Sequence, residues 1–219
     1  LTAQNMETVI RLGLFFGLFV CFFTLEILWP RKALSAPKLS RWFGNLTITI
    51  SNTLTLQLVF VALGVTAVGL GAIAQSHGWG LLNHFALPAP LAFALGLLLL
   101  DLAIYTQHLI FHRVPLLWRL HRMHHADTDI DVSTGLRFHP IEILLSMAIK
   151  MGLIIVLGIS PWAILVFEIV LNATSMFNHA NMALPLWLDR ALRLVVVTPD
   201  MHRVHHSVNA DEYNSNYGF

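Results

Sequence analysis

A short histidine-rich pattern occurs twice in this chain and is its clearest sign of chemistry. His121-Arg122-Met123-His124-His125 recurs about eighty residues later as His202-Arg203-Val204-His205-His206. Three imidazoles within five residues would repel one another when protonated and would need partners when neutral. A bound metal ion that uses their lone pairs is the simplest explanation, so the two repeats predict a metal site.

Three further histidines extend this set. His108 and His112 are four residues apart, which places both imidazoles on one face of a helix. His179 is brought to the same end of the chain's spans by a predicted hairpin. Nine imidazoles exceed the coordination of one ion, so we expect two ions, each with four or five nitrogen ligands and an open position. The predicted ligands are His108, His112, His121, His124, His125, His179, His202, His205 and His206.

The other three histidines and the choice of metal are less defined. We expect His77 and His84 to be ordinary interfacial side chains, and His139, before Pro140, to support a ligand or to begin a helix. Imidazole suits Zn, Fe, Cu and Ni alike, so the ligand type leaves the metal open. The chain has neither the His-Glu-x-x-His of zinc hydrolases nor the Glu-x-x-His of soluble di-iron bundles.

Composition predicts that these residues belong to a membrane protein. Hydrophobic residues make up 56% of the chain and charged residues 11%, whereas soluble domains carry roughly 25% charged residues. A formal net charge of +1 excludes a basic stripe for nucleic acid. Cys21 is the single cysteine, so intrachain disulfides and thiolate clusters are excluded.

The apolar runs predict an all-α fold: a multi-pass transmembrane helical bundle with a cytoplasmic histidine-rich di-metal site and an interfacial amphipathic helix. Four basic residues between Pro30 and Arg41, and none between Gln75 and Pro90, place the first connection and the histidines on the cytoplasmic side. We expect one membrane-embedded domain, 1–219, which is a fragment with an incomplete C-terminus. The predicted spans are 12–29, 46–74, 91–111, 141–157 and 162–177, followed by the interfacial helix at 184–197.

The histidine motifs resemble those of the fatty acid hydroxylase and sterol desaturase superfamily. The resemblance rests on His108-x-x-x-His112, on His121-x-x-His124-His125, on Asn178-His179-Ala180-Asn181 and on Thr198–Ser207, and it extends from about Asp101 to the C-terminus. It implies a membrane non-haem di-iron oxidoreductase that hydroxylates or desaturates a lipid. It also implies molecular oxygen as co-substrate and two electrons from a reductase through a ferredoxin or b-type cytochrome. The membrane would be the bacterial inner membrane or the endoplasmic reticulum.

Several polar residues near the histidines have predicted roles. Asp101, on the same predicted helix face as His108, is expected to hold an imidazole, and Asp200 has a similar role beside the last repeat. Arg122 and Arg203 are expected to be solvated or to face phosphate, with docking of an electron carrier as the alternative. The polar stripe Glu142, Ser146 and Lys150 is expected to serve structural pairing.

Two other functions remain open at this point. A di-zinc membrane hydrolase would use the same imidazoles without consuming oxygen. A bis-histidine haem carrier would need only two axial histidines and would leave seven unexplained. A metal transporter is less compatible, because transport sites lie near the middle of the bilayer, whereas these histidines cluster at the ends of the spans.

Overall fold

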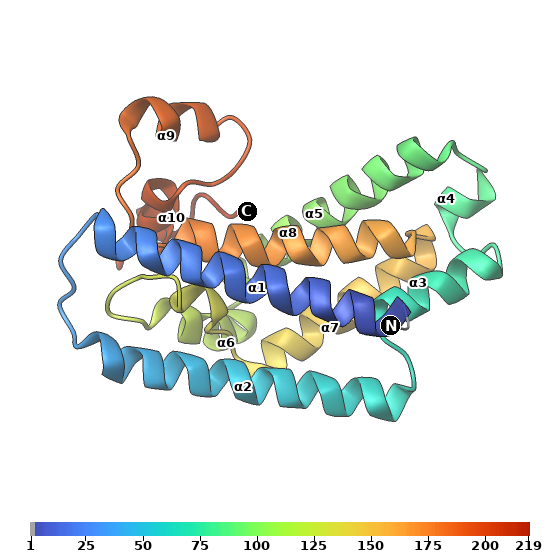
Figure 1. Ribbon diagram of the computed structural model, residues 1–219, viewed down its shortest axis with the longest axis horizontal. Helices are drawn as coiled ribbons and strands as arrows, with labels where there is room; N and C mark the ends of the chain where they lie inside the picture. Colours follow the sequence, from blue (N-terminus) through green and yellow to red (C-terminus); the bar gives the residue numbers. More distant parts are fainter. Residues whose placement is uncertain (1–2) are drawn as a thin grey trace. The chain divides into compact units, whose positions relative to one another are not determined.

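The computed structural model describes residues 3–219, which form helices joined by short connections (Figure 1). The predicted all-α class is confirmed, because no strand occurs within the described residues. Their order is α1 (Ala3–Leu28), α2 (Lys38–Leu63), α3 (Ala67–Ser76), α4 (Leu81–His84), α5 (Ala89–Arg113), α6 (Pro115–His125), the 3-10 turn Thr134–Leu136, α7 (Pro140–Leu157), α8 (Pro161–His179), α9 (Leu186–Leu192), α10 (Pro199–His205) and α11 (Ala210–Tyr213).

Five segments of the described chain are long and apolar enough to cross a membrane. Each overlaps one of the predicted spans, and large apolar side chains such as Phe16, Leu58 and Leu98 project outward from them. Such an exposed apolar surface suits lipid and not water. The segments are Asn5–Leu28, Lys38–His84, Ala89–Arg113, Pro140–Leu157 and Pro161–His179.

Two predicted helices differ from the observed ones. The predicted span 46–74 is broken, because α2 ends at Leu63, Gly64 takes a φ of 66°, and the Thr66 side chain caps the start of α3 by accepting from Gly69 N–H. The predicted interfacial helix 184–197 shrinks to α9. The β-branched run Val195–Val197 disfavours helix, and the chain leaves the helix at Arg193.

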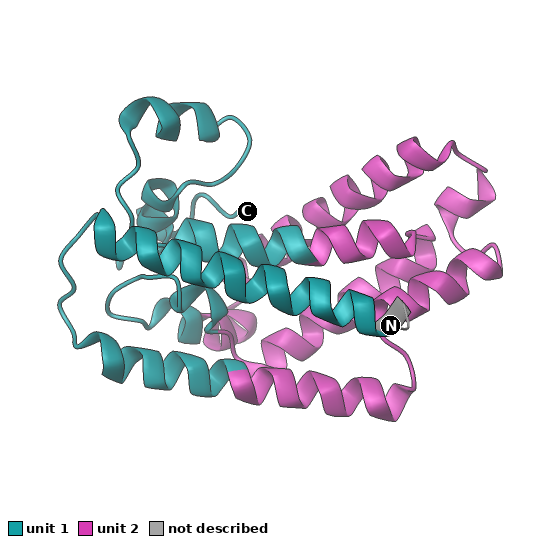
Figure 2. Cartoon of the chain, viewed as in Figure 1, with its two compact units in different colours: residues 1–49, 122–137, 169–219 teal, residues 50–121, 138–168 magenta. Residues whose placement is uncertain are grey.

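The chain divides into two compact units (Figure 2). Three helices, α2, α6 and α8, run without interruption from one unit into the other. The expectation of a single domain stays a prediction. Unit 1 comprises residues 1–49, 122–137 and 169–219, and unit 2 comprises residues 50–121 and 138–168.

In unit 1, the connection after α6 lies between α1 and α2 (Figure 1). Its buried side chains Val132 and Leu136 pack with Met176 of α8. Aromatic side chains of α1, among them Phe19 and Phe23, and Trp42 of α2 complete this apolar cluster. The connection that follows the first histidine repeat is therefore held by the first two helices of the chain.

Charged side chains anchor the same connection. Arg41 of α2 is buried, with Nε 2.7 Å from Asp127 Oδ1 and Nη1 2.7 Å from Asp131 Oδ2. Glu26 of α1 accepts from the backbone N–H of Val132 and of Asn181, at 2.6 and 2.8 Å. These contacts fix the segments that follow His125 and His179 in this unit.

The anchor predicts a loss of stability in acid. Burial by itself would raise the pKa of Asp127, but hydrogen bonds from Arg41, Thr134 and Asn45 outweigh it and hold the pKa below its usual value. A carboxylate with a lowered folded-state pKa stabilises the fold above its unfolded pKa, and that contribution is lost as pH falls through the folded value. We expect the melting temperature in detergent to fall between about pH 5 and 3.

Asp127→Asn should be less stable than the parent at pH 7, and its melting temperature should fall less steeply in acid. The exposed Asp211→Asn should match the parent at every pH, and a parent-like acid profile in Asp127→Asn would contradict the assignment.

In unit 2, α7 packs against α3, α4 and α5. The tightest approach joins two turns, because a Cβ at Gly80 would lie 2.0 Å from Gly158 N. Gly158 ends α7 with a φ of 71°, a conformation that glycine adopts without strain. Lys150 of α7 pairs with Glu168 of α8 at 2.5 Å, which confirms structural pairing for that part of the polar stripe.

Candidate metal centre

Four histidines of unit 1 converge on one point. His124 lies in the last turn of α6, and His179 ends α8. His202 begins the last turn of α10, and His206 directly follows that helix. One nitrogen from each lies within 4.8 Å of those from the other three. His124, His179 and His202 are 1% exposed, so the convergence is almost closed to solvent.

The Nε2 atoms are the ones that meet. His179 Nε2 lies 3.0 Å from His124 Nε2, 3.0 Å from His202 Nε2 and 3.1 Å from His206 Nε2. Two ligands bound at right angles to one ion, each at about 2.1 Å, would be about 3.0 Å apart. The spacing therefore matches nitrogens arranged around a single metal ion.

The opposite ring nitrogens determine which atoms carry hydrogen. His179 Nδ1 lies 2.6 Å from the Ser175 carbonyl oxygen, and His124 Nδ1 lies 3.0 Å from the Arg137 carbonyl oxygen. A carbonyl only accepts, so both Nδ1 atoms must donate, and both neutral rings then direct an Nε2 lone pair at the other. Facing lone pairs repel unless a cation lies between them, so this donor set fits a metal ion.

The surroundings keep the His206 imidazole neutral. Burial lowers the pKa of His206 well below its usual value, and the neighbouring histidines His125, His124, His202 and His179 lower it further. A neutral imidazole has the lone pair that a metal ligand needs. His206 can therefore offer its lone pair to a metal near neutral pH.

Gly135 shows how closely the chain surrounds this group. A Cβ at this position would lie 2.6 Å from the Ser175 carbonyl oxygen and 3.2 Å from His179 Nδ1. The Ser175 hydroxyl in turn donates to the Gly135 carbonyl oxygen at 2.9 Å. The absence of a side chain at Gly135 lets this loop approach the hydrogen bond that orients His179.

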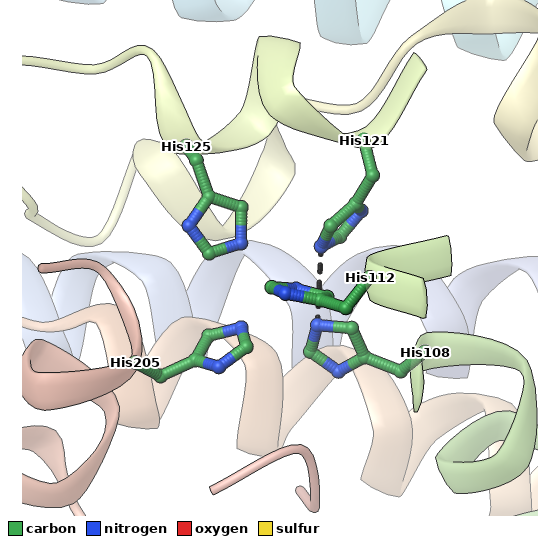
Figure 3. Close-up of side chains that lie close together, drawn as sticks. All are labelled: His108, His112, His121, His125 and His205. Atoms are coloured by element: carbon green, nitrogen blue, oxygen red, sulfur yellow. Dashed lines mark hydrogen bonds between the residues drawn. The ribbon is translucent and has the colours of Figure 1, made fainter. Parts of the chain in front are cut away.

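In unit 2, three histidines form a second gathering (Figure 3). His108 and His112 lie one turn apart on α5, and His121 on α6 points toward both. Ring centroids lie 4.8 Å apart for His108 and His121 and 4.9 Å apart for His112 and His121. His121 Nε2 is 3.1 Å from His108 Nε2, the same separation that occurs in the four-histidine group.

Glu142, on the first turn of α7, orients His121. Its Oε1 lies 2.7 Å from His121 Nδ1, and its side chain is 6% exposed. A carboxylate on Nδ1 directs Nε2 toward a metal and raises the basicity of that nitrogen. Sequence reasoning assigned Glu142 only to a structural stripe. The available signal was an ionisable residue at the start of an apolar span, which requires a partner.

We expect Glu142→Gln to weaken metal binding by the unit 2 histidines by about 10- to 100-fold, because the amide keeps the shape and loses the charge that supports His121. Competition with a chelator of known affinity would measure this change. Glu168→Gln is the matched control in the same unit, because that carboxylate pairs with Lys150, and it should leave metal affinity unchanged. Equal losses in the two variants would contradict a specific role for Glu142.

The remaining two predicted ligands, His125 and His205, also lie close together, with ring centroids 4.7 Å apart (Figure 3). His205 is fully buried, and its Nδ1 lies 2.7 Å from the Ser215 carbonyl oxygen. The carbonyl again fixes the hydrogen on Nδ1 and leaves Nε2 as the ligand atom. His125 is four residues after His121 on the continuous helix α6.

Other predicted site residues take different places. Asp101 is exposed on α5 and has no hydrogen bond to an imidazole within residues 3–219, which departs from its expected role. Asp200 Oδ1 accepts from Arg31 Nε at 2.8 Å, because a guanidinium is a stronger partner for a carboxylate than a neutral ring. His139 caps α7 by accepting from Ile141 N–H, which confirms a helix-entry role.

Four more residues lie outside the histidine groups. His77 and His84 are exposed near the ends of α3 and α4, and neither joins a histidine group among the described residues. Arg122 is exposed on α6, whereas Arg203 is partly buried and donates to Asn181 Oδ1 at 3.1 Å. The two arginines inside the repeats therefore have different surroundings.

Comparisons with known proteins identify a family for this arrangement. The fatty acid hydroxylase family model matches residues 93–219. The chain is 32% identical over 131 residues to ornithine lipid hydroxylase OlsE of Rhizobium tropici, a match that covers 59% of this chain and 39% of that protein. It is 29% identical over 146 residues to alkylglycerol monooxygenase of Homo sapiens, which covers 64% of this chain and 31% of that protein. The chain thus spans only about a third of the length of these relatives, and no solved structure matches it.

Proposed function

Because the chain belongs to the fatty acid hydroxylase family, we propose that it is a membrane oxygenase that hydroxylates a C–H bond of a lipid. The similar proteins named above are a lipid hydroxylase and a monooxygenase, which favours hydroxylation over desaturation. The balanced reaction is R–H + O2 + 2 electrons + 2 protons → R–OH + H2O. A ferredoxin or a b-type cytochrome with its reductase is the proposed electron donor.

The observation that carries this proposal is the convergence of four Nε2 atoms, two of which belong to rings whose Nδ1 is held by a carbonyl acceptor. His124, His179, His202 and His206 are the proposed ligands of one iron. We propose that the other iron is held by His108, His112, His121, His125 and His205. The support for this second set is the i, i+4 spacing on α6, which puts His121 and His125 on one helix face.

When bound, such an iron pair activates molecular oxygen for attack on an unactivated C–H bond. The residues of this chain orient the histidine ligands and exclude water. Carbonyl groups of Ser175, Arg137 and Ser215 fix the ring orientation of their histidines, and the burial of these rings keeps water from the reacting atoms.

The proposed orientation has the histidines on the cytoplasmic side of the membrane. Its support is the run of basic residues between α1 and α2, in which Arg31 and Lys32 directly follow a candidate span. The soluble electron donors of a cell are found on that side. A cysteine introduced at the exposed Ala33 should react with an impermeant thiol reagent only after the cytoplasmic face is opened.

Oxidation in isotopically labelled oxygen gas tests the function. Membranes that contain the chain, supplied with a reductant and an electron donor, should yield lipid carrying one labelled oxygen atom by mass spectrometry. Metal analysis on the same sample should give about two irons per chain. Water-derived oxygen in the product together with zinc would identify a hydrolase instead, and a Soret band with two axial histidines would identify a haem carrier.

A further inference from the structure

A polar cavity of about 560 Å³ adjoins the four-histidine group within unit 1. Arg31, Lys32, Asn181, Arg193 and Arg203 are among its lining residues, and so is His206 of the four-histidine group. The nine-histidine centre uses only His206 among these side chains. The cavity is therefore an additional polar site that borders the predicted metal position.

The cavity lies where two candidate spans end. Trp29 follows the span Asn5–Leu28, and Asn181 follows the span Pro161–His179. A short antiparallel pairing joins these two ends: Arg31 N–H donates to the Asn181 carbonyl at 3.0 Å, and Ala183 N–H donates to the Trp29 carbonyl at 2.8 Å. Residues that directly follow membrane spans lie at the level of lipid head groups.

Two buried nitrogens of cavity-lining residues have no hydrogen-bond partner within residues 3–219. One is Arg203 Nε, which always carries a hydrogen, and the other is His206 Nδ1, which carries one when Nε2 binds metal. A buried donor without a partner is unfavourable, so each of these nitrogens calls for an acceptor. A ligand oxygen held in the cavity would satisfy both.

Charge pairing shows which sign the ligand should have. Of the four carboxylates at the cavity, Asp127 pairs with Arg41, Asp129 accepts from the backbone N–H of Ser35 and Ala36, and Asp200 pairs with Arg31. Glu212 is exposed. The positive charges of Arg203 and Lys32 have no carboxylate within ion-pair distance among the described residues.

We propose that this cavity binds the anionic oxygens of a lipid head group, a phosphate or a carboxylate, through Arg203 with support from Lys32. This inference rests on the proposed lipid hydroxylation. Because His206 belongs to the cavity wall and to the four-histidine group, the bound head group would lie beside the metal. The carbon that is oxidised should accordingly lie within a few bonds of the head group and not far along an acyl chain.

Direct binding to the full iron-loaded chain in detergent micelles tests the site. The probes are phosphatidic acid, phosphatidylcholine and diacylglycerol with identical acyl chains. The parent should bind phosphatidic acid at least about tenfold more tightly than diacylglycerol, since a charge-assisted hydrogen bond contributes about 1.5–3 kcal/mol. Arg203→Met should remove most of this preference, and Lys32→Met, at an exposed position, should reduce it several-fold.

Arg190→Met is the matched control, because Arg190 is exposed in the same unit and does not line the cavity. It should bind phosphatidic acid like the parent. The proposal would be overturned if the parent bound all three lipids with equal affinity. It would also be overturned if Arg190→Met and Arg203→Met lost the same amount of affinity for phosphatidic acid. Tight binding of inorganic phosphate that phosphatidic acid cannot displace would also overturn it. The same holds if Arg203→Met loses binding to an acidic ferredoxin but keeps its binding to phosphatidic acid.

The binding readout separates this inference from the proposed function. If the chain prefers phosphatidic acid but never hydroxylates lipid, the proposed oxygenase function is refuted and the head-group site is supported. If labelled oxygen enters anionic and neutral lipids at equal rates, the head-group site is refuted and the proposed oxygenase function is supported. Iron per chain is measured in every variant. Lipid binding by Arg203→Met is compared with that of the parent only when both contain the same amount of iron.

Discussion

Replacing His179 with alanine is expected to abolish lipid oxidation and to lower the iron content by about one ion per chain. His179 Nε2 is the common neighbour of the other three Nε2 atoms in its group, at 3.0–3.1 Å. The remaining three imidazoles lose the central member of the set. A metal ion contributes several kcal/mol to catalysis, which corresponds to a loss of roughly a thousandfold or more. Iron analysis and labelled-oxygen turnover on the same membranes would measure both effects.

His84→Ala is the control for this variant. His84 is exposed at the end of α4 and belongs to neither histidine group, so turnover and iron should stay within about twofold of the parent. The His179→Ala chain should remain in the membrane, because insertion depends on apolar length. Full iron content in His179→Ala, or lost activity in His84→Ala, would refute the assignment of ligands.

The second large effect concerns Arg41. Its guanidinium is 7% exposed and pairs with Asp127 and Asp131, which are 3% and 1% exposed. It also donates to the Asp129 carbonyl oxygen and to Thr134 Oγ1. Removing one partner of a buried ion pair leaves uncompensated charge and costs about 3–5 kcal/mol. Arg41→Met should therefore lower the free energy of unfolding by about that amount, as measured by denaturant titration in mixed micelles.

Arg11→Met provides the comparison. Arg11 forms an i, i+4 pair with Glu7 on α1, and both side chains are about a quarter exposed. Exposed pairs contribute roughly 0–1 kcal/mol, so this variant should be nearly as stable as the parent. Similar losses in the two variants would show that the buried network does not hold the connection between α6 and α7.

Much of this centre follows from the spacing of a few residues. The i, i+4 pair at His108 and His112 and the two repeats identify eight histidines, and the predicted hairpin adds His179. The structure gathers each of the nine with at least one other within its unit. Apolar length likewise predicts the long helices, because 20 or so apolar residues have few alternatives in a bilayer. These signals are local in sequence.

The missed features depend on long-range contacts. Glu142 meets His121 from 21 residues away, and Arg41 meets the Asp127–Asp131 loop from 86–90 residues away. Nothing in the spacing of these residues encodes such a partner. Asp101 was expected to support a ligand because it shares a predicted helix face with His108, yet the packing of α5 leaves its side chain exposed. The break at Gly64 was missed because a single glycine is compatible with a continuous helix until its φ is known.

The anchoring of residues 127–132 on Arg41, Ser35 and Glu26 has a consequence for expressing parts of this protein. The family match begins at residue 93 and contains all nine predicted ligands, so residue 93 would be an obvious start for a shortened chain. A chain cut there would retain every imidazole and lose the guanidinium that Asp127 and Asp131 share. During synthesis the first two helices leave the ribosome before any histidine of the centre does, so their partners are in place when the ligands arrive. The smallest piece that folds on its own should therefore be longer than the region that the family model matches, and it should include α1 and α2.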